Sequence, residues 1–315
     1  MKKIITYIIA TLIAITLIMG ILTIINRFVF LPAIYDPANF VLDETTYIMG
    51  DSHTQCAIDP EVMPNTVNLS KNSENYFLTY IKLKYFLQHN KPKRIVLNFS
   101  YHNFSTLYDD EMLKTRRNVM LDRYYPIIES EENVFTSKHD IDLLYTKLKY
   151  DWGLPIDFSN NLHLYLYLKS NKEPDIANYP FGGYYRYNGT CNLSQETIKH
   201  SLEAHYNKDG KNAGISELMY ASAIQICKLC AENDIEIILV NTPVHPGYYE
   251  KIPDIFFENH KKVYKYLQTN YNVTYYDFSQ FPIPDAGYGD GDHLNAVGAK
   301  IFTTELITVL KPLEK

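Results

Sequence analysis

Two short stretches of this 315-residue sequence carry side chains that can act together as a nucleophile, a base and an orienting acid. Ser52 follows an apolar run that stops at Gly50, and a helix-compatible stretch begins after it. Asp290 and His293 lie close together near the other end of the chain. A serine hydroxyl becomes a strong nucleophile when a histidine takes its proton and a carboxylate fixes the tautomer of that histidine. The three residues therefore predict acyl transfer through a covalent serine ester.

Both stretches leave alternatives open. A serine in the position of Ser52 is also typical of a turn residue that caps the following helix. Asp292 competes with Asp290 for the role of orienting His293. We predict Asp290, because a carboxylate at this spacing can fold back onto the imidazole Nδ1, whereas adjacent side chains in an extended loop diverge. Asp292 is therefore expected to point away from the imidazole.

The pattern of apolar residues indicates which elements position these side chains. Short β-rich runs alternate with stretches of helical spacing, which is typical of a parallel sheet joined by right-handed crossovers. We predict five strands, at Thr45–Met49, Thr66–Leu69, Arg94–Phe99, Ile235–Val240 and Val273–Tyr276. We predict helices at Tyr76–Gln88, Ile215–Asn233, Phe256–Tyr271 and Ala296–Leu310. Ser52 then lies beyond the carboxyl end of the first strand, where α/β sheets hold their sites.

A long segment, 104–214, interrupts this regular order after the third strand. It contains a helical stretch, Ile141–Tyr150, and an aromatic stretch that includes Tyr184, Tyr185 and Tyr187. An insertion on an outgoing loop lies at the same sheet edge as the candidate nucleophile, and such loops often carry specificity. We expect the insertion to shape the acceptor site and the three tyrosines to bind substrate.

The N-terminus predicts a membrane anchor. Lys2 and Lys3 precede Ile4–Ile25, which has no charge and would span roughly 33 Å as a helix, enough for a bilayer core. No small-residue cleavage site follows this run, so residues 1–27 are expected to be an uncleaved signal-anchor. The basic start is expected to stay in the cytoplasm, which places the body of the chain outside it.

The remaining chain is predicted to form a linker and one catalytic domain. Residues 28–44 form the linker, in which Pro32 and Pro37 discourage helix. Residues 45–315 form the domain, with 104–214 as its insertion.

Composition narrows the class of partner. A net charge of −6 argues against a nucleic-acid partner, which usually needs a basic face. The 28 tyrosines suit sugar binding, but a compositional bias explains them equally well. Cys227 and Cys230 form the single Cys-x-x-Cys, and no second pair completes a zinc site, so two small buried helix residues are the preferred interpretation. We predict neither a metal nor a cofactor.

Three motifs together resemble the SGNH/GDSL hydrolase superfamily. They are Gly50-Asp51-Ser52 after the first strand, Asp290-x-x-His293 before the last helix, and His293-Leu294-Asn295 followed by Gly298-Ala299. The resemblance covers the element order over most of Thr45–Leu310, with the sequence matches at its two ends. It implies a flavodoxin-like three-layer fold around a central five-stranded parallel sheet. It also implies that Ser52 is the nucleophile, His293 the base and Asp290 the orienting residue.

The same resemblance implies an oxyanion hole built from the Ser52 N–H, a Gly after the second strand and an Asn after the third. This chain has no Gly after the second strand and no Gly-x-Asn-Asp string after the third. We therefore expect a backbone N–H near Ser70 and the side chain of Asn103 to act as donors. Two more histidines are candidates for substrate contact. His53, beside the nucleophile, is expected mainly at the surface, and His245 is expected in a structural loop.

The anchor makes the chain similar in architecture to the membrane-tethered proteins of this superfamily that acylate envelope polymers, such as the alginate O-acetylation proteins and the D-alanine transfer protein of teichoic acid synthesis. That likeness implies a membrane-bound O-acyltransferase as the upstream donor and a glycan as the acceptor. We expect an extracytoplasmic O-acyltransferase that acts on an envelope or secreted glycan. An esterase that uses the same serine, and a non-catalytic glycan-binding or assembly protein on the same scaffold, remain the alternatives.

Overall fold

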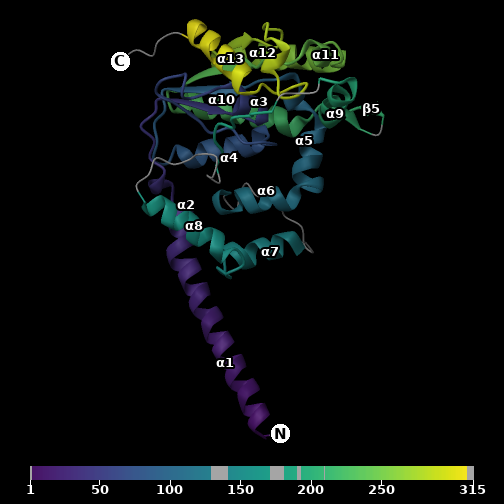
Figure 1. The fold of residues 1–315 in the computed structure, drawn as a ribbon. Helices are drawn as coiled ribbons and strands as arrows, with labels where there is room; N and C mark the ends of the chain where they lie inside the picture. The colour runs from purple at the N-terminus through teal and green to yellow at the C-terminus, as the bar shows by residue number, and fades with distance from the viewer. Residues whose placement is uncertain (1, 129–140, 171–180, 190–192, 209, 311–315) are drawn as a thin grey trace. The chain divides into compact units, whose positions relative to one another are not determined.

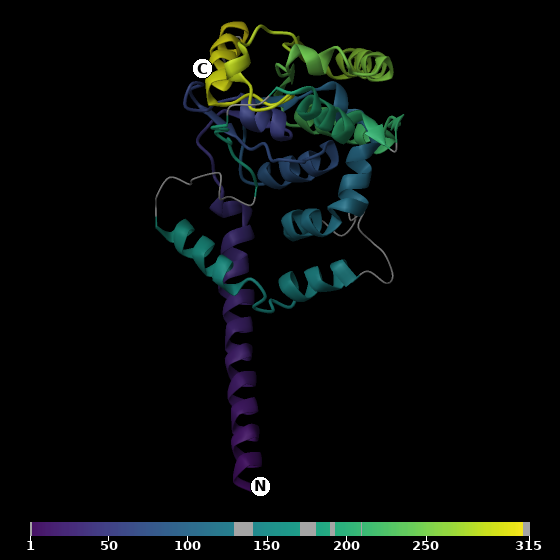
Figure 2. The same ribbon diagram turned by 45° about the vertical axis from the view of Figure 1, so that its right-hand side comes forward.

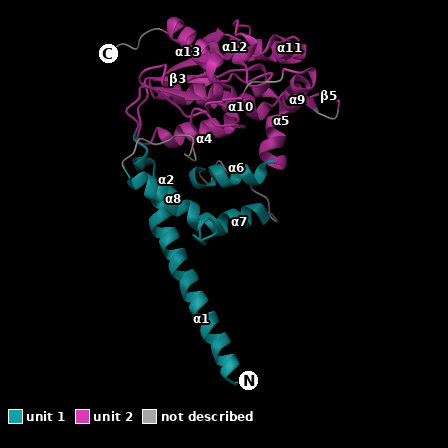
Figure 3. Ribbon diagram, in the orientation of Figure 1, with its two compact units in different colours: residues 1–41, 116–174 teal, residues 42–115, 175–315 magenta. Residues whose placement is uncertain are grey.

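The computed structural model describes residues 2–128, 141–170, 181–189, 193–208 and 210–310. The chain divides into two compact units, which are coloured separately in Figure 3. The first unit contains residues 1–41 and 116–174. The second contains residues 42–115 and 175–315 and holds the sheet. The middle part of the segment expected as an insertion therefore belongs with the N-terminal helix, and only its two ends belong with the sheet.

The second unit is built on a five-stranded parallel sheet, which confirms the α/β prediction (Figure 1). The strand order is β2-β1-β3-β6-β7, and every neighbouring pair runs parallel. The strands are β1 (Thr46–Met49), β2 (Thr66–Asn68), β3 (Arg94–Asn98), β6 (Glu236–Asn241) and β7 (Thr274–Asp277). Each begins and ends within one residue of the run predicted for it, because apolar β-branched runs mark buried strands clearly.

Helices cover both faces of this sheet. Tyr47 and Ile48 are adjacent in β1, so their side chains point to opposite faces. The ring of Tyr47 lies 6.5 Å from that of Phe86 on helix α4 (Tyr76–Phe86). Ile48 instead packs in a core cluster that includes Phe302 of helix α13 (Ala296–Val309). The central strands are thus buried on both sides, which explains why β1, β3 and β6 consist mostly of apolar residues.

Further elements of this unit complete the layers around the sheet. The longer helices are α3 (Ser52–Ala57), α10 (Glu217–Glu232), α12 (Asp254–Tyr271) and α9 (Gln195–Tyr206). The shorter elements are α5 (Thr106–Asp110), α11 (Pro246–Tyr249), the 3-10 helices Tyr101–Phe104 and Asp285–Gly287, and the strand pair β4 (Asn207–Lys208) and β5 (Lys211–Asn212). Cys227 and Cys230 lie on α10 as buried free thiols, where burial raises the pKa of Cys227 to about 12.

The first unit begins with helix α1 (Lys2–Ile25), which extends away from the rest of its unit in Figures 1 and 2. The helical run continues without a break to Tyr35 and is long and apolar enough to cross a membrane. Three further helices belong to this unit, α6 (Arg117–Tyr124), α7 (Ile141–Tyr150) and α8 (Phe158–Lys169).

The expectation that Pro32 keeps the linker out of a helix is wrong. A π-helical stretch, Asn26–Phe30, leads directly into helix α2 (Leu31–Tyr35), and the Leu31 N–H donates to the Asn26 carbonyl. Pro32 is the second residue of α2 and lies inside this continuous helical run, directly after the π-helical stretch, where the hydrogen bonds leave the regular α-helical pattern. Pro37 likewise begins a short 3-10 helix, Pro37–Asn39, which Asp36 caps.

Candidate active site

Ser52, His293 and Asp290 form one hydrogen-bonded chain. The Ser52 Oγ lies 2.7 Å from the His293 Nε2. The Nδ1 of the same ring lies 2.9 Å from both carboxylate oxygens of Asp290. These contacts place a hydroxyl, an imidazole and a carboxylate in the order that nucleophilic catalysis requires. All three side chains are partly exposed, so a ligand can reach them.

The turn at Gly50 explains how Ser52 is held in this position. Gly50 has a φ of +142°, and a Cβ on it would lie 2.4 Å from the Cβ of Asn98 and 2.8 Å from the Thr54 Oγ1. Only glycine fits this backbone at this distance from β3. The chain therefore turns sharply out of β1, and Ser52 becomes the first residue of α3. Its N–H lies in the first helical turn, where such groups have no partner inside the helix.

Asp51 is a buried anchor for the loop that follows β3. Its carboxylate caps α3 by accepting from the His53 N–H at 2.9 Å. It also accepts from four side chains: Asn98 Nδ2 (2.8 Å), Asn103 Nδ2 (2.9 Å), Tyr108 OH (2.6 Å) and His102 Nε2 (3.0 Å). Burial by itself would raise the pKa of Asp51, but the charge of His53 and the hydrogen bond from His102 hold that pKa well below its usual range.

The two donors expected to complete an oxyanion hole are engaged elsewhere. The side-chain nitrogen of Asn103 donates to Asp51, and its oxygen accepts from the Ser100 N–H at 2.7 Å. The Ser70 N–H donates to the Asn68 Oδ1 at 3.0 Å. Asn103 and Ser70 therefore fix the loops beside Ser52. Of the three donors expected for an oxyanion hole, the N–H of Ser52 is the one that could still donate to a ligand.

The placement expected for His53 is wrong, and so is the orientation expected for Asp292. Both side chains are buried, at 1% and 2% exposure. The His53 Nε2 lies 3.6 Å from the Asp292 Oδ2, and its Nδ1 lies 3.3 Å from the Asp51 Oδ1. Asp292 also lies 3.6 Å from the His293 Nδ1 instead of pointing away from that ring. The loop before α13 turns tightly enough that neighbouring carboxylates converge, because Asp290 accepts from the N–H groups of Asp292 and His293.

Four histidine rings gather behind Ser52. The His53 ring centroid lies 4.1 Å from that of His102, 5.5 Å from that of His205 and 5.0 Å from that of His293. His102 and His205 were not expected here. His102 follows β3 directly, which is a usable signal because that loop meets the carboxyl edge of the sheet. His205 lies on α9 within the insertion, and its sequence neighbourhood gives no such signal.

The pKa values of these imidazoles are shifted in different directions. Burial and the charge of His53 lower the pKa of His102, and burial and the charge of His102 lower the pKa of His205 well below its usual range. For His293, burial acts in the lowering direction, but the charge of Asp292 and the hydrogen bond to Asp290 raise the pKa to about 9. Positive charge in the cluster is therefore favoured on the ring that contacts Ser52.

The histidine cluster also has the composition of a metal site. His53, His102 and His205 form one set of possible ligands, and His53, Asp292 and His293 form another, each with ligand atoms within 4.8 Å of one another. The nitrogens of the outer rings already make hydrogen bonds. His102 Nε2 contacts Asp51, His205 Nδ1 lies 2.7 Å from the Tyr248 OH, and both nitrogens of His293 contact Ser52 and Asp290. Both nitrogens of His53 lack a hydrogen-bond partner among the described residues. The other rings already use nitrogens in hydrogen bonds to protein groups, which is a poor fit to a metal centre.

The predicted tyrosines lie on a segment that hydrogen-bonds both to the helix that begins at Ser52 and to the helix that follows His293. The Tyr185 N–H donates to the carbonyl of Gln55 in α3 at 3.0 Å, and the Tyr187 carbonyl accepts from the Ala296 N–H at the start of α13 at 2.9 Å. The ring of Tyr187 leaves no room for a side chain on Gly289, because a Cβ there would lie 2.6 Å from it. Tyr185 is 53% exposed, whereas Tyr184 and Tyr187 are half-buried.

His245 was a candidate for substrate contact but was expected to lie in a structural loop, and the structure gives it a structural contact. It caps α11, with its Nδ1 accepting from the Gly247 N–H at 3.1 Å. Its ring lies edge-on to that of Tyr288 at 5.3 Å. Its Nε2 lies 3.7 Å from Asp285, an exposed carboxylate.

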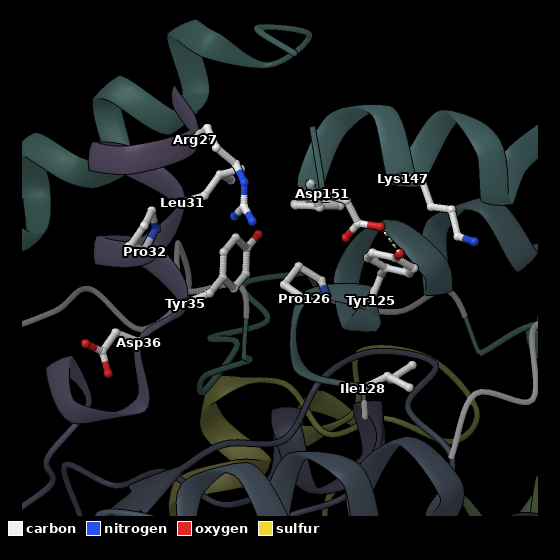
Figure 4. A pocket seen from close by; sticks show the side chains of 11 residues that line it. Arg27, Leu31, Pro32, Tyr35, Asp36, Tyr125, Pro126, Ile128, Lys147 and Asp151 are labelled. Atoms are coloured by element: carbon white, nitrogen blue, oxygen red, sulfur yellow. Dashed lines mark hydrogen bonds between the residues drawn. The ribbon is translucent and has the colours of Figure 1, made fainter. Parts of the chain in front are cut away.

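A separate pocket of about 790 Å³ lies within the first unit. Figure 4 shows its lining, in which Arg27, Tyr35 and Lys147 are mixed with apolar side chains such as Leu31 and Pro126. A dashed line in Figure 4 marks the hydrogen bond from the Tyr125 OH to Asp151, at 2.7 Å. None of the residues that line it belongs to the group around Ser52.

Compared with known protein families and with curated proteins, the chain matches none of them.

Proposed function

We propose that this chain is a serine-nucleophile acyl-transfer enzyme of the SGNH/GDSL type, anchored in a membrane by α1. The observation that carries the proposal is the 2.7 Å contact between the Ser52 Oγ and the His293 Nε2, with Asp290 2.9 Å from the opposite ring nitrogen. Each group contacts the next at a distance suited to proton transfer.

The reaction follows from these contacts. Neutral His293 takes the Ser52 proton while the oxygen attacks an ester carbonyl, and Asp290 stabilises the imidazolium that forms. The negative oxygen of the tetrahedral intermediate accepts from the Ser52 N–H. His293 then gives its proton to the leaving alcohol, which departs and leaves an acyl group on Ser52. A second alcohol or water, deprotonated by His293, releases the acyl group and restores the serine.

The acceptor that we favour is a hydroxyl of an envelope or secreted glycan. Support comes from α1, which is long and apolar enough to hold the chain beside such a polymer, and from the exposed ring of Tyr185 on the segment beside both catalytic stretches. Aromatic faces suit the apolar faces of sugars. The upstream acyl donor would then be a membrane-bound O-acyltransferase. An esterase would use the same groups with water as the acceptor.

The alternative of a non-catalytic glycan-binding protein is favoured by one observation. Asn103 and the Ser70 N–H, the two expected oxyanion donors, both bond to other groups. A site with one donor would stabilise the tetrahedral intermediate less, because loss of one donor costs about 10²–10³ in turnover in well-studied serine enzymes.

A fluorophosphonate probe separates these proposals. With the full chain in detergent or nanodiscs, we expect covalent labelling that disappears in Ser52→Ala and weakens in His293→Gln. Labelling that persists in Ser52→Ala, or no labelling of a folded wild-type protein between pH 7 and about pH 10, would exclude a nucleophilic Ser52.

The acceptor is identified with the same preparation. Incubation with an activated acetyl ester and an added glycan should yield acetylated glycan if the enzyme is a transferase. Release of acetate alone, at a rate independent of the glycan, would identify an esterase and contradict the transferase proposal. The Ser52→Ala protein is the control for non-enzymatic transfer.

A further inference from the structure

Helix α7 exposes an apolar stripe on one side. Ile141 is 79% exposed, Leu144 56% and Tyr145 48%, and this spacing places the three residues on one face of the helix. The opposite side buries Leu143 and Tyr150. A helix with apolar residues on both faces needs a partner on each, and among the described elements α6 packs on the buried face.

The turn after α7 is fixed to the end of the apolar helix. The side-chain nitrogen of Asn26 donates to the carbonyls of Gly153 and Leu154, at 3.1 and 3.2 Å, and its oxygen accepts from the Asn161 Nδ2 at 2.8 Å. Asn26 is fully buried. Gly153 packs directly on Arg27, since a Cβ there would lie 2.4 Å from the Arg27 Cβ. The turn is therefore held at the residue where the uncharged run of α1 ends.

This attachment fixes the position of Trp152 along the axis of α1, close to the end of the apolar run. Trp152 precedes Gly153 and its side chain is 68% exposed. Tryptophan is enriched at the boundary between the hydrocarbon core and the headgroups of a membrane. If α1 spans a membrane, a tryptophan that adjoins the contact with Arg27, the first charged residue after the apolar run, is placed near that boundary.

The orientation of α7 is consistent with a position of Trp152 at the membrane boundary. In Figures 1 and 2, α7 lies crosswise to α1, beside its C-terminal part, and α6 lies on the side of α7 that is farther from the N-terminus. The buried face of α7 packs on α6. The exposed stripe therefore faces the side on which the N-terminal part of α1 extends, which is the membrane side if α1 spans the bilayer.

We propose that the α7 stripe (Ile141, Leu144 and Tyr145) and Trp152 insert into the interfacial region of the bilayer, on the side of the membrane where α1 ends. The partner is the lipid surface itself. α7 is then an amphipathic helix that lies in the plane of the membrane surface. Helix α7 and Trp152 then form a second membrane contact besides α1, and this contact stops the first unit from pivoting about α1. This inference rests on α1 spanning a membrane, and it is independent of the chemistry of Ser52.

Trp152 is the single tryptophan of the chain, so its fluorescence reports on this contact directly. The full chain is reconstituted in nanodiscs whose lipids carry bromine either near the headgroup or near the acyl-chain end. We expect stronger quenching by the shallow bromine, and protection of about threefold from aqueous acrylamide relative to the protein unfolded in denaturant. Equal access to acrylamide in both states, with no quenching by either lipid, would overturn the proposal.

Variants separate insertion from general effects. Leu144→Glu and Tyr145→Glu should restore acrylamide quenching and reduce quenching by the shallow bromine. Val297→Glu on α13 is the matched control, because Val297 is 59% exposed in the second unit and should leave both signals unchanged. Circular dichroism of each variant checks that the helices persist.

The test also distinguishes other occupants of the stripe. If a second copy of the chain covers it, Trp152 is protected without lipid quenching, and the protection disappears when the nanodisc holds one chain. If α1 does not span the bilayer, the wild-type chain is extracted from vesicles by carbonate. That result would refute the topology and the contact together, whereas a retained chain with exposed Trp152 would refute the contact alone.

Discussion

The carboxylate of Asp292 lies 3.6 Å from the Nε2 of His53, with both side chains buried. The same carboxylate lies 3.6 Å from the Nδ1 of His293, so one buried negative charge faces two imidazoles. Asp290 makes the shorter contact to His293, at 2.9 Å. In the proposed mechanism, Asp290 therefore orients the base, and we expect Asp292 to set the affinity of that base for a proton.

The first prediction concerns pH. Because Asp292 and Asp290 raise the pKa of His293 to about 9, the free enzyme holds this base protonated at neutral pH. A protonated base cannot take the Ser52 proton, so the rate of fluorophosphonate labelling should rise with pH until His293 is deprotonated. At pH 7 we expect about a hundredth of the plateau rate. A profile with a midpoint below pH 7 in the folded wild type would contradict this account.

The second prediction tests Asp292 as the source of that shift. Asp292→Asn removes the largest influence that raises the His293 pKa, so the midpoint of the labelling profile should fall by about one unit, equivalent to 1.4 kcal/mol. The labelling rate at pH 7 should therefore rise. Asp285→Asn is the control, because this exposed carboxylate faces His245 instead. An unchanged midpoint in Asp292→Asn would show that Asp292 does not set the pKa of the base.

The third prediction concerns the orienting residue. Asp290→Asn keeps the size of the side chain but removes the acceptor that holds the proton on Nδ1, so the imidazole can adopt the wrong tautomer. Turnover measured at the plateau pH should fall by up to about 10⁴-fold and approach that of Ser52→Ala. Asp292→Asn should lose less than about tenfold at the same pH, under 1.4 kcal/mol of barrier. A larger loss in Asp292→Asn than in Asp290→Asn, with both proteins folded, would reverse the two roles.

The fourth prediction concerns the loop anchor. Asp51→Ala leaves Asn98, Asn103, Tyr108 and His102 with buried donors that have lost their acceptor. Removing one partner of such a network costs about 3–5 kcal/mol, so the variant should melt well below the wild type. Asp59→Ala is a suitable comparison, because the Asp59 carboxylate is also buried but accepts from the nearby Glu61 N–H. Equal melting temperatures for Asp51→Ala and the wild type would refute the role of Asp51 as an anchor.

The fifth prediction separates the tyrosines by exposure. Tyr185→Ala should weaken binding of a glycan acceptor and leave hydrolysis of a small activated ester nearly intact, because its ring is exposed. Tyr187→Ala should lower both activities and the melting temperature, since its ring packs against Gly289 in the loop before His293. The measurement is KM for the glycan beside kcat for the small ester. Equal loss of both activities in Tyr185→Ala would assign that residue a structural role.

The sequence predicted the parts of this site that depend on local signals. Apolar runs marked the strands, and the turn after β1 and the loop before α13 therefore fell at one sheet edge, as the Ser52–His293 contact requires. Asp290 was found by its spacing to His293. Tertiary packing determined the rest. His205 reaches the site from a helix of the insertion, and its neighbours in the sequence say nothing about the rings it will meet.

Two expectations failed for reasons of local geometry. His53 was expected at the surface because it follows the nucleophile, but α3 begins at Ser52, and a helix turns successive side chains through about 100°. The ring of His53 is therefore directed inward. Pro32 was expected to discourage helix, but the helical run passes through it beside a π-helical stretch, where the regular hydrogen-bond pattern is already altered. Propensity alone could not identify this local change in the helix.

The distance along the chain between Ser52 and His293 also governs when the site forms. Ser52 leaves the ribosome 241 residues before His293, and the strands between them pair over long loops. Until α13 docks, Ser52 has neither a base nor the Tyr187–Ala296 hydrogen bond that closes the segment beside it. Until His293 has emerged and the loop that carries it has folded, Ser52 is therefore expected to remain an ordinary, unactivated hydroxyl.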